Sequence, residues 1–278
     1  MLAAGEGFSL AEVRCPGARA GFDRPELECG HVLVTARRGV FVRRVRGQEV
    51  FVDGTVAYLS APDTVEQFAH PVPGGDVCTV IRFDAGLIAA LSGGDPDIRH
   101  PALPMDAASE LALRHVIGLA RAGDPDGSLA ERVARLASGL LARRFPDRAS
   151  SSRPATAAAR SRLVDQAKAA LAADPRLALT GLSRAVGCSP HHLSRVFTQL
   201  AGCTVSQYRN RLRVTRALER IGDGEQDLAG LAAELGFSDH AHLTRTMRAA
   251  TGHTPSTCRA VLVTTRPDSV MAGIALRR

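Results

Sequence analysis

The sequence predicts an α+β fold, with a small β-barrel, a helical connector, and an all-α domain of two helix-turn-helix motifs joined by a long helix. Three observations carry this prediction. Short runs rich in β-branched and aromatic residues fill the chain up to about Phe83. From Met105 onwards, apolar residues recur at helical spacing. Between Leu182 and Cys258, one pattern of apolar residues, glycine and capping residues occurs twice.

The first part of the chain is typical of short strands separated by turn residues. Arg46-Gly47 and Asp53-Gly54 are tight-turn signals, and residues 71–76 predict a loop. Because no helical pattern interrupts the strands, we expect one small barrel or sandwich over residues 1–104. The predicted strands are 8–13, 31–35, 40–45, 49–52, 56–59, 66–69 and 77–83.

Residues 105–146 carry two stretches of helical periodicity, which the segment Gly123-Asp-Pro-Asp-Gly127 separates. Two antiparallel helices at this place would either pair with a second chain or cover the barrel, and the sequence leaves both arrangements open. Residues 147–160 are rich in Ser, Ala, Arg and Pro, a composition typical of a flexible linker. A helix is then expected over 161–173.

The first copy of the repeated pattern opens at Thr180, which is expected to cap a short helix. Gly187 ends that helix, as a residue tolerant of positive φ should. Ser189 caps the next helix, and Pro190 takes its first position, where a missing N–H costs nothing. Apolar residues of this second helix face the core. Its outward face carries His191, Ser194, Arg195 and Thr198.

The second copy repeats these features in the same order. Gly236 ends its first helix, and Asp239 stands where Ser189 stands in the first copy, as the cap of the second helix. Its outward face carries His240, Ala241, Thr244, Arg245 and Arg248. Arg245 aligns with Arg195. In a helix-turn-helix this second helix is the one that enters the DNA major groove.

Residues 205–221 lie between the copies and contain neither Gly nor Pro. Their apolar residues share one side, so we expect a single helix, roughly 25 Å long at about 1.5 Å per residue. Successive major grooves are about 34 Å apart along the duplex. A rigid rod of this length could hold two recognition helices in neighbouring grooves.

The stretch from about Ser161 to Ala260 resembles the DNA-binding domain of the AraC/XylS family of bacterial transcription regulators. The motifs that carry the resemblance are Leu179-Thr-Gly-Leu-Ser-Arg-Ala-Val-Gly-Cys-Ser-Pro-His-His-Leu-Ser-Arg-Val-Phe197, Glu234-Leu-Gly-Phe-Ser-Asp-His-Ala-His-Leu-Thr-Arg-Thr-Met247 and Gly252-His-Thr-Pro255. The resemblance implies a DNA-binding domain over 161–262, followed by a tail at 263–278.

By this resemblance, three residues in each recognition helix match base-contacting positions. They are His191, Ser194 and Arg195 in the first helix, and His240, Ala241 and Arg245 in the second. The chain departs from the family where Cys258 replaces a usual Tyr and Met247 a usual Phe, both at packing positions. Ala241 replaces a commonly polar residue, so the second helix is expected to depend on Arg245 and on backbone contacts.

The resemblance also implies several partners. They are double-stranded promoter DNA, a small effector bound by a cupin-like barrel over residues 1–104, a second copy of the chain paired through the connector, and RNA polymerase. No cofactor is expected, and no effector-binding residue is assigned. Arg38, Arg43, Arg44, Arg46 and Arg82 could pair with an anionic effector or face solvent on alternate strand positions.

The positive charge of the chain is concentrated in the half that holds the repeat. Of the net charge of +7, residues 1–149 contribute −2, with 17 Arg against 19 acidic residues. Residues 150–278 contribute +9, with 17 Arg and one Lys against 9 acidic residues. A basic, arginine-rich domain suits contacts with DNA phosphates and a salt-dependent affinity.

Several features point to a cytoplasmic protein without a membrane partner. No apolar run reaches the ~20 residues of a membrane span. The segment Met1-Leu-Ala-Ala-Gly-Glu-Gly lacks the basic and apolar regions of a signal peptide. In a reducing compartment the six cysteines are expected to stay thiols. They are Cys15, Cys29, Cys78, Cys188, Cys203 and Cys258.

We therefore expect a sequence-specific transcription regulator that responds to a small effector, and two alternatives stay open. A cupin-type metalloenzyme fused to a DNA-binding module would need a His-x-His pair, which the sequence lacks, so neither enzyme activity nor a metal is expected. Cys29, His31, His70 and Cys78 could together bind zinc, although their spacing matches no known metal signature. The other alternative is a thiol or metal sensor that uses Cys15, Cys29 or Cys78.

Overall fold

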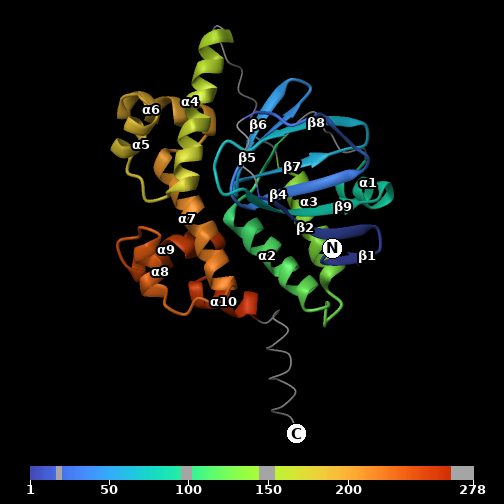
Figure 1. Ribbon diagram of the computed structural model, residues 1–278. Coiled ribbons are helices and arrows are strands. Elements are labelled where there is room, and N and C mark those ends of the chain that lie inside the picture. Colours follow the sequence, from blue (N-terminus) through green and yellow to red (C-terminus); the bar gives the residue numbers. More distant parts are fainter. Residues whose placement is uncertain (17–20, 95–101, 144–153, 264–278) are drawn as a thin grey trace.

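The computed structural model describes residues 1–16, 21–94, 102–143 and 154–263. Strands come first and build two antiparallel sheets, and helices follow, so the predicted α+β fold is confirmed (Figure 1). The tail at 264–278 and the start of the predicted linker lie outside the described residues.

Two antiparallel sheets make up the N-terminal part, which we call the sandwich. The larger has the strand order β1-β2-β9-β4-β7-β10, and the smaller has the order β3-β8-β5-β6. All seven predicted strands are present, with ends shifted by one to three residues. The strands are β1 (Ala3–Gly5), β2 (Phe8–Cys15), β3 (Glu26–Glu28), β4 (His31–Arg38), β5 (Phe41–Val45), β6 (Gln48–Val52), β7 (Val56–Ser60), β8 (Thr64–Ala69), β9 (Asp76–Phe83) and β10 (Leu103–Pro104).

The larger sheet is buried on both faces, because its side chains alternate between two cores. Leu10, Leu33 and Ile81 lie on the face that packs against helices. Val34 and Cys78 lie on the opposite face, between the two sheets. The strand pattern therefore predicts the sandwich correctly, but it does not predict α1 (Ala85–Ser92), whose Ile88 joins the first of these cores.

Helices α2 (Ala107–Arg121) and α3 (Leu129–Leu141) form the predicted connector and cover the larger sheet. Val133, Leu136 and Leu140 of α3 are buried in the same core as Leu33 of β4. Of the two arrangements that the sequence leaves open, these apolar faces thus serve to cover the strands.

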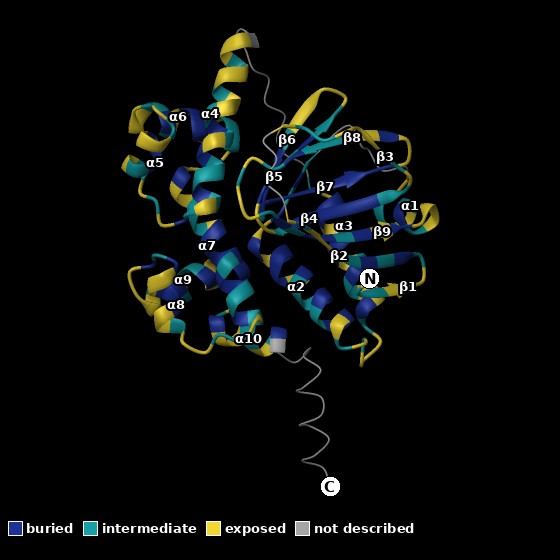
Figure 2. Cartoon of the chain, in the orientation of Figure 1, coloured by how far each residue is buried: buried dark blue, intermediate teal, exposed yellow. Residues whose placement is uncertain are grey.

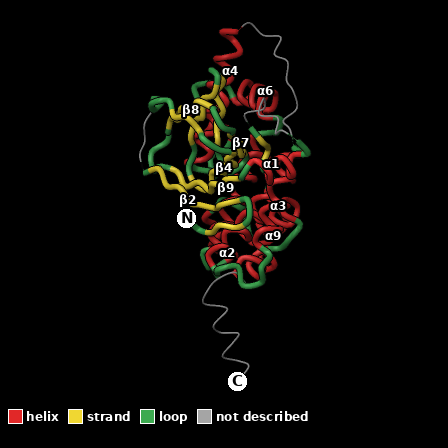
Figure 3. Tube along the Cα trace, turned by 90° about the vertical axis from the view of Figure 1, so that its right-hand side faces the viewer, coloured by secondary structure: helices red, strands yellow, loops and turns green. Residues whose placement is uncertain are grey.

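Helices α4 to α10 form the C-terminal part (Figures 1 and 3). The longest of them after α4 is α7, which lies between a first module, α5–α6, and a second module, α8–α9. Their bounds are α4 (Pro154–Ala173), α5 (Leu179–Ala185), α6 (Pro190–Ala201), α7 (Val205–Gly222), α8 (Leu228–Glu234), α9 (His240–Thr251) and α10 (Pro255–Val263).

Two expectations for this part are wrong in detail. The linker predicted over 147–160 is helical from Pro154 onwards, because α4 begins there instead of at Ser161. The alanine-rich run after Pro154 favours a helix, and proline is tolerated in a first helical turn. The short helix α5 begins at Leu179 and has Ala178 at its N-cap without a side-chain bond, so Thr180 lies inside the helix and does not cap it.

Helix α2 belongs to two hydrophobic cores. Its residues Leu113 and Val116 are buried against the larger sheet and α3. Its residues Ala107 and Leu111 are buried with Leu218 of α7 in the core of the second module. The sandwich and the C-terminal helices therefore share a continuous packed boundary along α2.

Candidate functional site

The first recognition helix, α6, is fixed at both ends by the residues that the sequence singles out. The Ser189 side chain accepts a hydrogen bond from the backbone N–H of His192, and Pro190 occupies the first turn. Gly202 ends the helix in the left-handed conformation, with φ of 75°. Leu193 and Phe197 are fully buried, which turns the opposite face of α6 outward.

The second recognition helix, α9, repeats this construction. Asp239 accepts a hydrogen bond of 2.6 Å from the backbone N–H of His242, and Gly252 ends the helix with φ of 79°. The bond from His242 holds the pKa of the Asp239 carboxyl below its ordinary value. Met247 and Cys258, where the chain departs from the AraC/XylS pattern, are fully buried, as expected for packing positions.

Most of the residues predicted to contact DNA are exposed. Figure 2, which colours the chain by burial, shows exposed segments in both modules. Ser194 and Thr244, which occupy equivalent positions, are half-buried. The exposed ones are His191, Arg195 and Thr198 on α6, and His240, Ala241, Arg245 and Arg248 on α9. Figure 1 shows α6 and α9 one above the other, on the side of α7 away from the strands.

Charge is available on both outward faces. Within the described ranges, no carboxylate forms an ion pair with Arg195, Arg245 or Arg248. Arginines elsewhere in the chain are commonly paired, as Arg82 is with Glu28 at 2.9 Å. An exposed guanidinium without a carboxylate partner can donate to guanine or phosphate oxygens without first breaking an ion pair.

Four arginines of α7, which the sequence reasoning did not single out, attach the rod to α4, to the loop between α4 and α5, and to the second module. Arg209 donates to the backbone carbonyl of Leu177 at 3.0 Å, and Arg213 donates to that of Pro175 at 2.9 Å. Arg216 donates to the Ala172 carbonyl at the end of α4. Arg220 pairs with Glu234 of α8 at 2.5 Å. Their spacing of three and four residues along one helix is the signal that could have identified them.

The two modules thus have separate cores that share one rod. Tyr208 and Leu212, in the first half of α7, pack with α4 to α6. Val214 and Leu218, in the second half, pack with α8 to α10. The predicted single helix is confirmed, and a capping box at Thr204 and Gln207 fixes its start. With 18 residues it is about 27 Å long.

A cavity of about 310 Å³ opens between the two sheets of the sandwich. Val34, Phe41 and Phe68 form part of its apolar wall. Glu66 also lines it and forms an almost fully buried ion pair of 2.6 Å with Arg43. Burial raises the pKa of Tyr58, over whose ring the Arg43 guanidinium lies at 4.2 Å. Four more carboxylates, those of Asp23, Glu26, Glu28 and Asp76, also line the cavity, so its wall is mixed. A concave site with apolar walls and placed polar groups is typical of a small-molecule site.

The arginines considered for an anionic effector are mostly engaged. Arg43 pairs with Glu66, Arg44 with Glu49 at 2.6 Å, and Arg82 with Glu28. Arg38 pairs with Glu219 of α7. Arg46 lies in the turn between β5 and β6, with φ of 50°. An anion entering the cavity would therefore have to compete with carboxylates of the chain itself.

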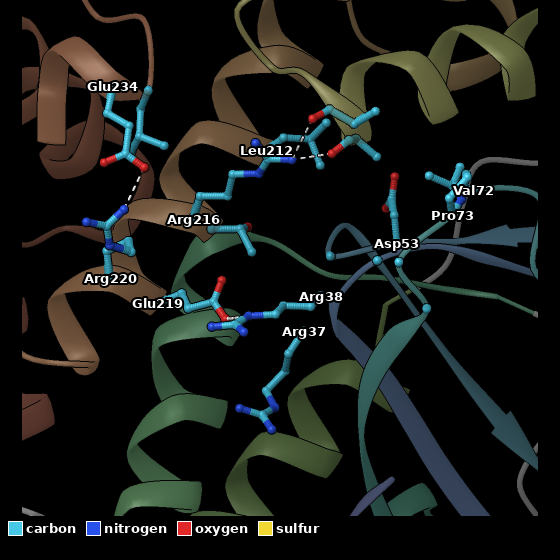
Figure 4. A pocket seen from close by; sticks show the side chains of 18 residues that line it. Arg37, Arg38, Asp53, Val72, Pro73, Leu212, Arg216, Glu219, Arg220 and Glu234 are labelled. Carbon is cyan, nitrogen blue, oxygen red and sulfur yellow. Dashed lines mark hydrogen bonds and ion pairs between the residues drawn. The ribbon is translucent and has the colours of Figure 1, made fainter. Parts of the chain in front are cut away.

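A second cavity, of about 550 Å³, lies between the sandwich and the C-terminal helices (Figure 4). Arg37, Arg38 and the loop 72–75 line it from the sandwich, and Arg216, Glu219 and Arg220 line it from α7. Asp53 also borders it, and burial raises the pKa of this carboxyl, although the charge of Lys168 opposes the shift. This polar cavity separates the two parts beside their packed boundary.

The proposed zinc ligands do not form one cluster. Cys29 is exposed. Cys15, which the sequence suggests for a thiol or metal sensor but not for the zinc cluster, lies beside His70 and Asp76, where one ligand atom from each side chain is within 4.8 Å of the others. Asp76 was not singled out from the sequence. No helix in the described part of the chain has the length and apolarity needed to cross a membrane.

Comparison with known proteins places residues 182–260 in a family described as a helix-turn-helix domain. The arabinose operon regulatory proteins of Salmonella typhimurium and Escherichia coli are 29% and 28% identical over 88 residues, 32% of this chain and 31% and 30% of their own lengths. A probable transcription factor, PqrA of Proteus vulgaris, is 30% identical over 73 residues, 26% of this chain and 60% of that protein. The chain therefore spans about a third of the arabinose regulators' length.

Solved structures that resemble the chain include ToxT from Vibrio cholerae, at 10% identity over 93% of this chain and 99% of that one, with a TM-score of 0.36. Another is a transcriptional regulator with an AraC-type DNA-binding domain from Chromobacterium violaceum, at 27% identity over 37% of this chain and 94% of that one, with a TM-score of 0.35. Superpositions at these scores support no conclusion about this chain.

Proposed function

We infer that this chain, a member of the AraC type of helix-turn-helix regulators by its C-terminal part, is a sequence-specific transcription regulator that responds to a small effector. The observation that carries the proposal is the pair of recognition helices. Each presents an exposed arginine, Arg195 or Arg245, that forms no ion pair with a carboxylate of the described residues. Both helices are attached to one rod, α7. The relatives of the C-terminal part are themselves named as regulators or transcription factors.

We propose that α6 and α9 enter successive major grooves of promoter DNA. Arg195 and Arg245 are the main readers, most naturally of guanine O6 and N7. Further DNA contacts are proposed for the other outward residues of each helix. They are His191, Ser194 and Thr198 in α6, and His240, Ala241, Thr244 and Arg248 in α9.

The proposed division of labour follows the chain. Residues 1–104 sense the effector, residues 105–146 connect, and residues 161–262 bind DNA. The cavity between the sheets would take the effector, and the shared boundary along α2 would pass its binding on to the recognition helices. A cytoplasmic location and contact with RNA polymerase follow from regulation of transcription. We propose no enzyme activity, since the relatives are regulators.

A homodimer is also proposed, and it would need a surface other than the apolar faces of α2 and α3, which pack on the sandwich. Val13, Leu27 and Val65 are large apolar side chains that the sandwich exposes, and Leu27 pairs with Val65 across β3 and β8. This edge of the smaller sheet is the candidate face.

The test is a selection of bound fragments from a genomic DNA library by the full-length protein at moderate salt. We expect a site with two short blocks about one helical turn apart, one for each recognition helix. A single block would mean that α9 only contacts the backbone. Absence of enrichment with and without candidate effectors, over a range of salt concentrations, would contradict DNA binding.

A further inference from the structure

Three side chains with different donor atoms meet at the rim of the sandwich cavity. Cys15 ends β2, Asp76 begins β9, and the two residues are register partners in the larger sheet. His70 directly follows β8 of the other sheet. The Cys15 sulfur, a His70 ring nitrogen and an Asp76 carboxylate oxygen lie within 4.8 Å of one another, and all three residues line the cavity.

The carboxylate of Asp76 is the centre of this group. Its side chain is only 2% exposed, and its Oδ2 lies 2.9 Å from His70 Nε2. That contact with His70 is the polar contact of Oδ2 within the described residues. Its Oδ1 accepts a bond of 3.2 Å from the Cys78 thiol. A buried carboxylate is costly unless a cation neutralises it, and either a protonated imidazole or a metal ion could do so here.

We propose that Cys15, His70 and Asp76 bind a divalent transition-metal ion of the zinc type. A sulfur, an imidazole nitrogen and a carboxylate oxygen together suit zinc, whereas magnesium and calcium prefer oxygen alone. Bonds of about 2.0–2.3 Å place tetrahedral donors about 3.3–3.8 Å apart. His70 Nε2 and Asp76 Oδ2, now 2.9 Å apart, would therefore open by a few tenths of an ångström, whereas donors as far apart as 4.8 Å would close by about an ångström. Cys78 orients the Asp76 carboxylate through its hydrogen bond, as partners of metal ligands commonly do.

Three protein ligands leave one position of a tetrahedral site open towards the cavity. Water or a small ligand in the cavity can complete the coordination. This site differs from the four-residue zinc site that the sequence suggests. Cys29 and His31 are not part of it, and Cys78 would not bind the ion but would donate a hydrogen bond to its ligand Asp76.

The segment between two of the ligands reaches the C-terminal helices. Residues 72–75, between His70 and Asp76, line the cavity that faces α7. Gly75 packs so closely on the Cys15 carbonyl that a Cβ atom there would lie 1.9 Å from its oxygen. A Cβ atom on Gly39 would likewise lie 2.2 Å from the carbonyl oxygen of Gly75. The residue before Gly39, Arg38, pairs with Glu219 of α7.

Rearrangement of the three ligands around an ion would therefore move residues 72–75. These residues pack against Gly39, which is next to Arg38 and its ion pair with Glu219. The metal would be the effector, or part of its binding site, and α7 would be the element that receives the signal. This regulatory step rests on the proposed function, whereas the metal site itself does not.

The site is tested by titrating reduced, chelator-treated full-length protein with Co²⁺, whose bond to a thiolate absorbs in the near ultraviolet. We expect that band to appear with one equivalent of Co²⁺ and to disappear when Zn²⁺ is added. Cys15→Ser should abolish the band, and His70→Gln should weaken Co²⁺ binding at least tenfold. Cys29→Ser and His31→Gln are matched controls that should leave both unchanged.

Absence of the band in the unsubstituted protein would overturn the site, whatever the folding of the variants. A band that survives Cys15→Ser but not Cys29→Ser would also overturn it. The regulatory step is tested with the DNA site found by selection, where Zn²⁺ should change the dissociation constant roughly tenfold. Cobalt binding with unchanged DNA affinity would refute the regulatory step alone, and cobalt binding without any selected DNA would refute the proposed function alone.

Discussion

The hydroxyl of Tyr208, on α7, donates a hydrogen bond to Oδ2 of Asp53, at the turn between β6 and β7, and both residues are buried. The bond joins the rod between the two recognition helices to the sandwich. Asp53 Oδ1 meanwhile accepts bonds from the Thr55 backbone N–H and hydroxyl, at 2.8 and 2.7 Å. Tyr208 is thus a donor that reaches Asp53 from the other part, in addition to the Arg38–Glu219 pair.

Tyr208→Phe should destabilise the protein by about 1–3 kcal/mol, because it leaves a buried carboxylate oxygen without a donor. Chemical unfolding measures this change. The control is Tyr58→Phe, at the other tyrosine of the chain, which is buried within the sandwich. An equal loss of unfolding free energy in both variants would mean that the Tyr208–Asp53 bond stabilises the protein no more than the hydroxyl of a tyrosine within the sandwich does.

Arg195→Ala should weaken binding to the selected DNA site by about 1–3 kcal/mol and relax the preference at one base pair. The physical reason is the loss of a bidentate contact with guanine. Binding to a panel of single-base variants measures both effects. Arg135→Ala, at an exposed arginine of α3, is the control for loss of one positive charge. Unchanged affinity and base preference in Arg195→Ala would remove this residue from the interface.

Arg43→Met should destabilise the sandwich by about 3–5 kcal/mol, because it leaves the buried Glu66 carboxylate without its partner. Its neighbour on the same strand is the matched control. Arg44 pairs with Glu49 near the surface, so Arg44→Met should cost less than about 1 kcal/mol. Thermal unfolding of the two variants compares them directly, and similar costs would show that burial of the pair does not matter.

Asp239→Asn tests the cap of α9 through its pH dependence. The pKa of Asp239 is lowered in the folded protein, so its contribution to stability is present above the unfolded pKa of about 3.9. That contribution is lost as the pH falls through the lower, folded value. Asparagine caps about as well but does not titrate.

The stability difference between Asp239→Asn and the unsubstituted protein should therefore shift in favour of the variant below about pH 4. Unfolding at pH 6 and pH 3 measures this shift. Ser189→Asn, at the equivalent cap of α6, should show no such shift, because neither residue titrates there. A pH-independent difference for Asp239→Asn would contradict the assigned role of its charge.

Much of the fold follows from local patterns. The seven predicted strands have β-branched and aromatic residues between turn signals. The caps Ser189 and Asp239 set the first residues of the recognition helices through bonds within three residues, so they do not depend on the rest of the chain. The strand β3 escaped prediction because its sequence, Glu26-Leu-Glu28, is acidic and mostly exposed. Only its pairing with β8 makes it a strand.

The parts of the candidate sites that depend on long-range packing could not be predicted. Cys15 meets Asp76 because β2 and β9 pair in one particular register, and His70 joins them from the other sheet. Nothing in the spacing of these residues encodes that register. The contact between Tyr208 and Asp53 could not be predicted either. The sequence around a tyrosine in a helix does not indicate which distant turn its hydroxyl will bond.

The membership of α2 in two cores means that the sandwich and the second module cannot melt independently. Unfolding of either would strip apolar surface from the same helix, on the Leu113 side or on the Leu111 side. Heat should therefore take both apart in a single calorimetric transition, with the van't Hoff and calorimetric enthalpies in agreement. The stability of the part proposed to bind DNA would then depend on the part proposed to bind the effector.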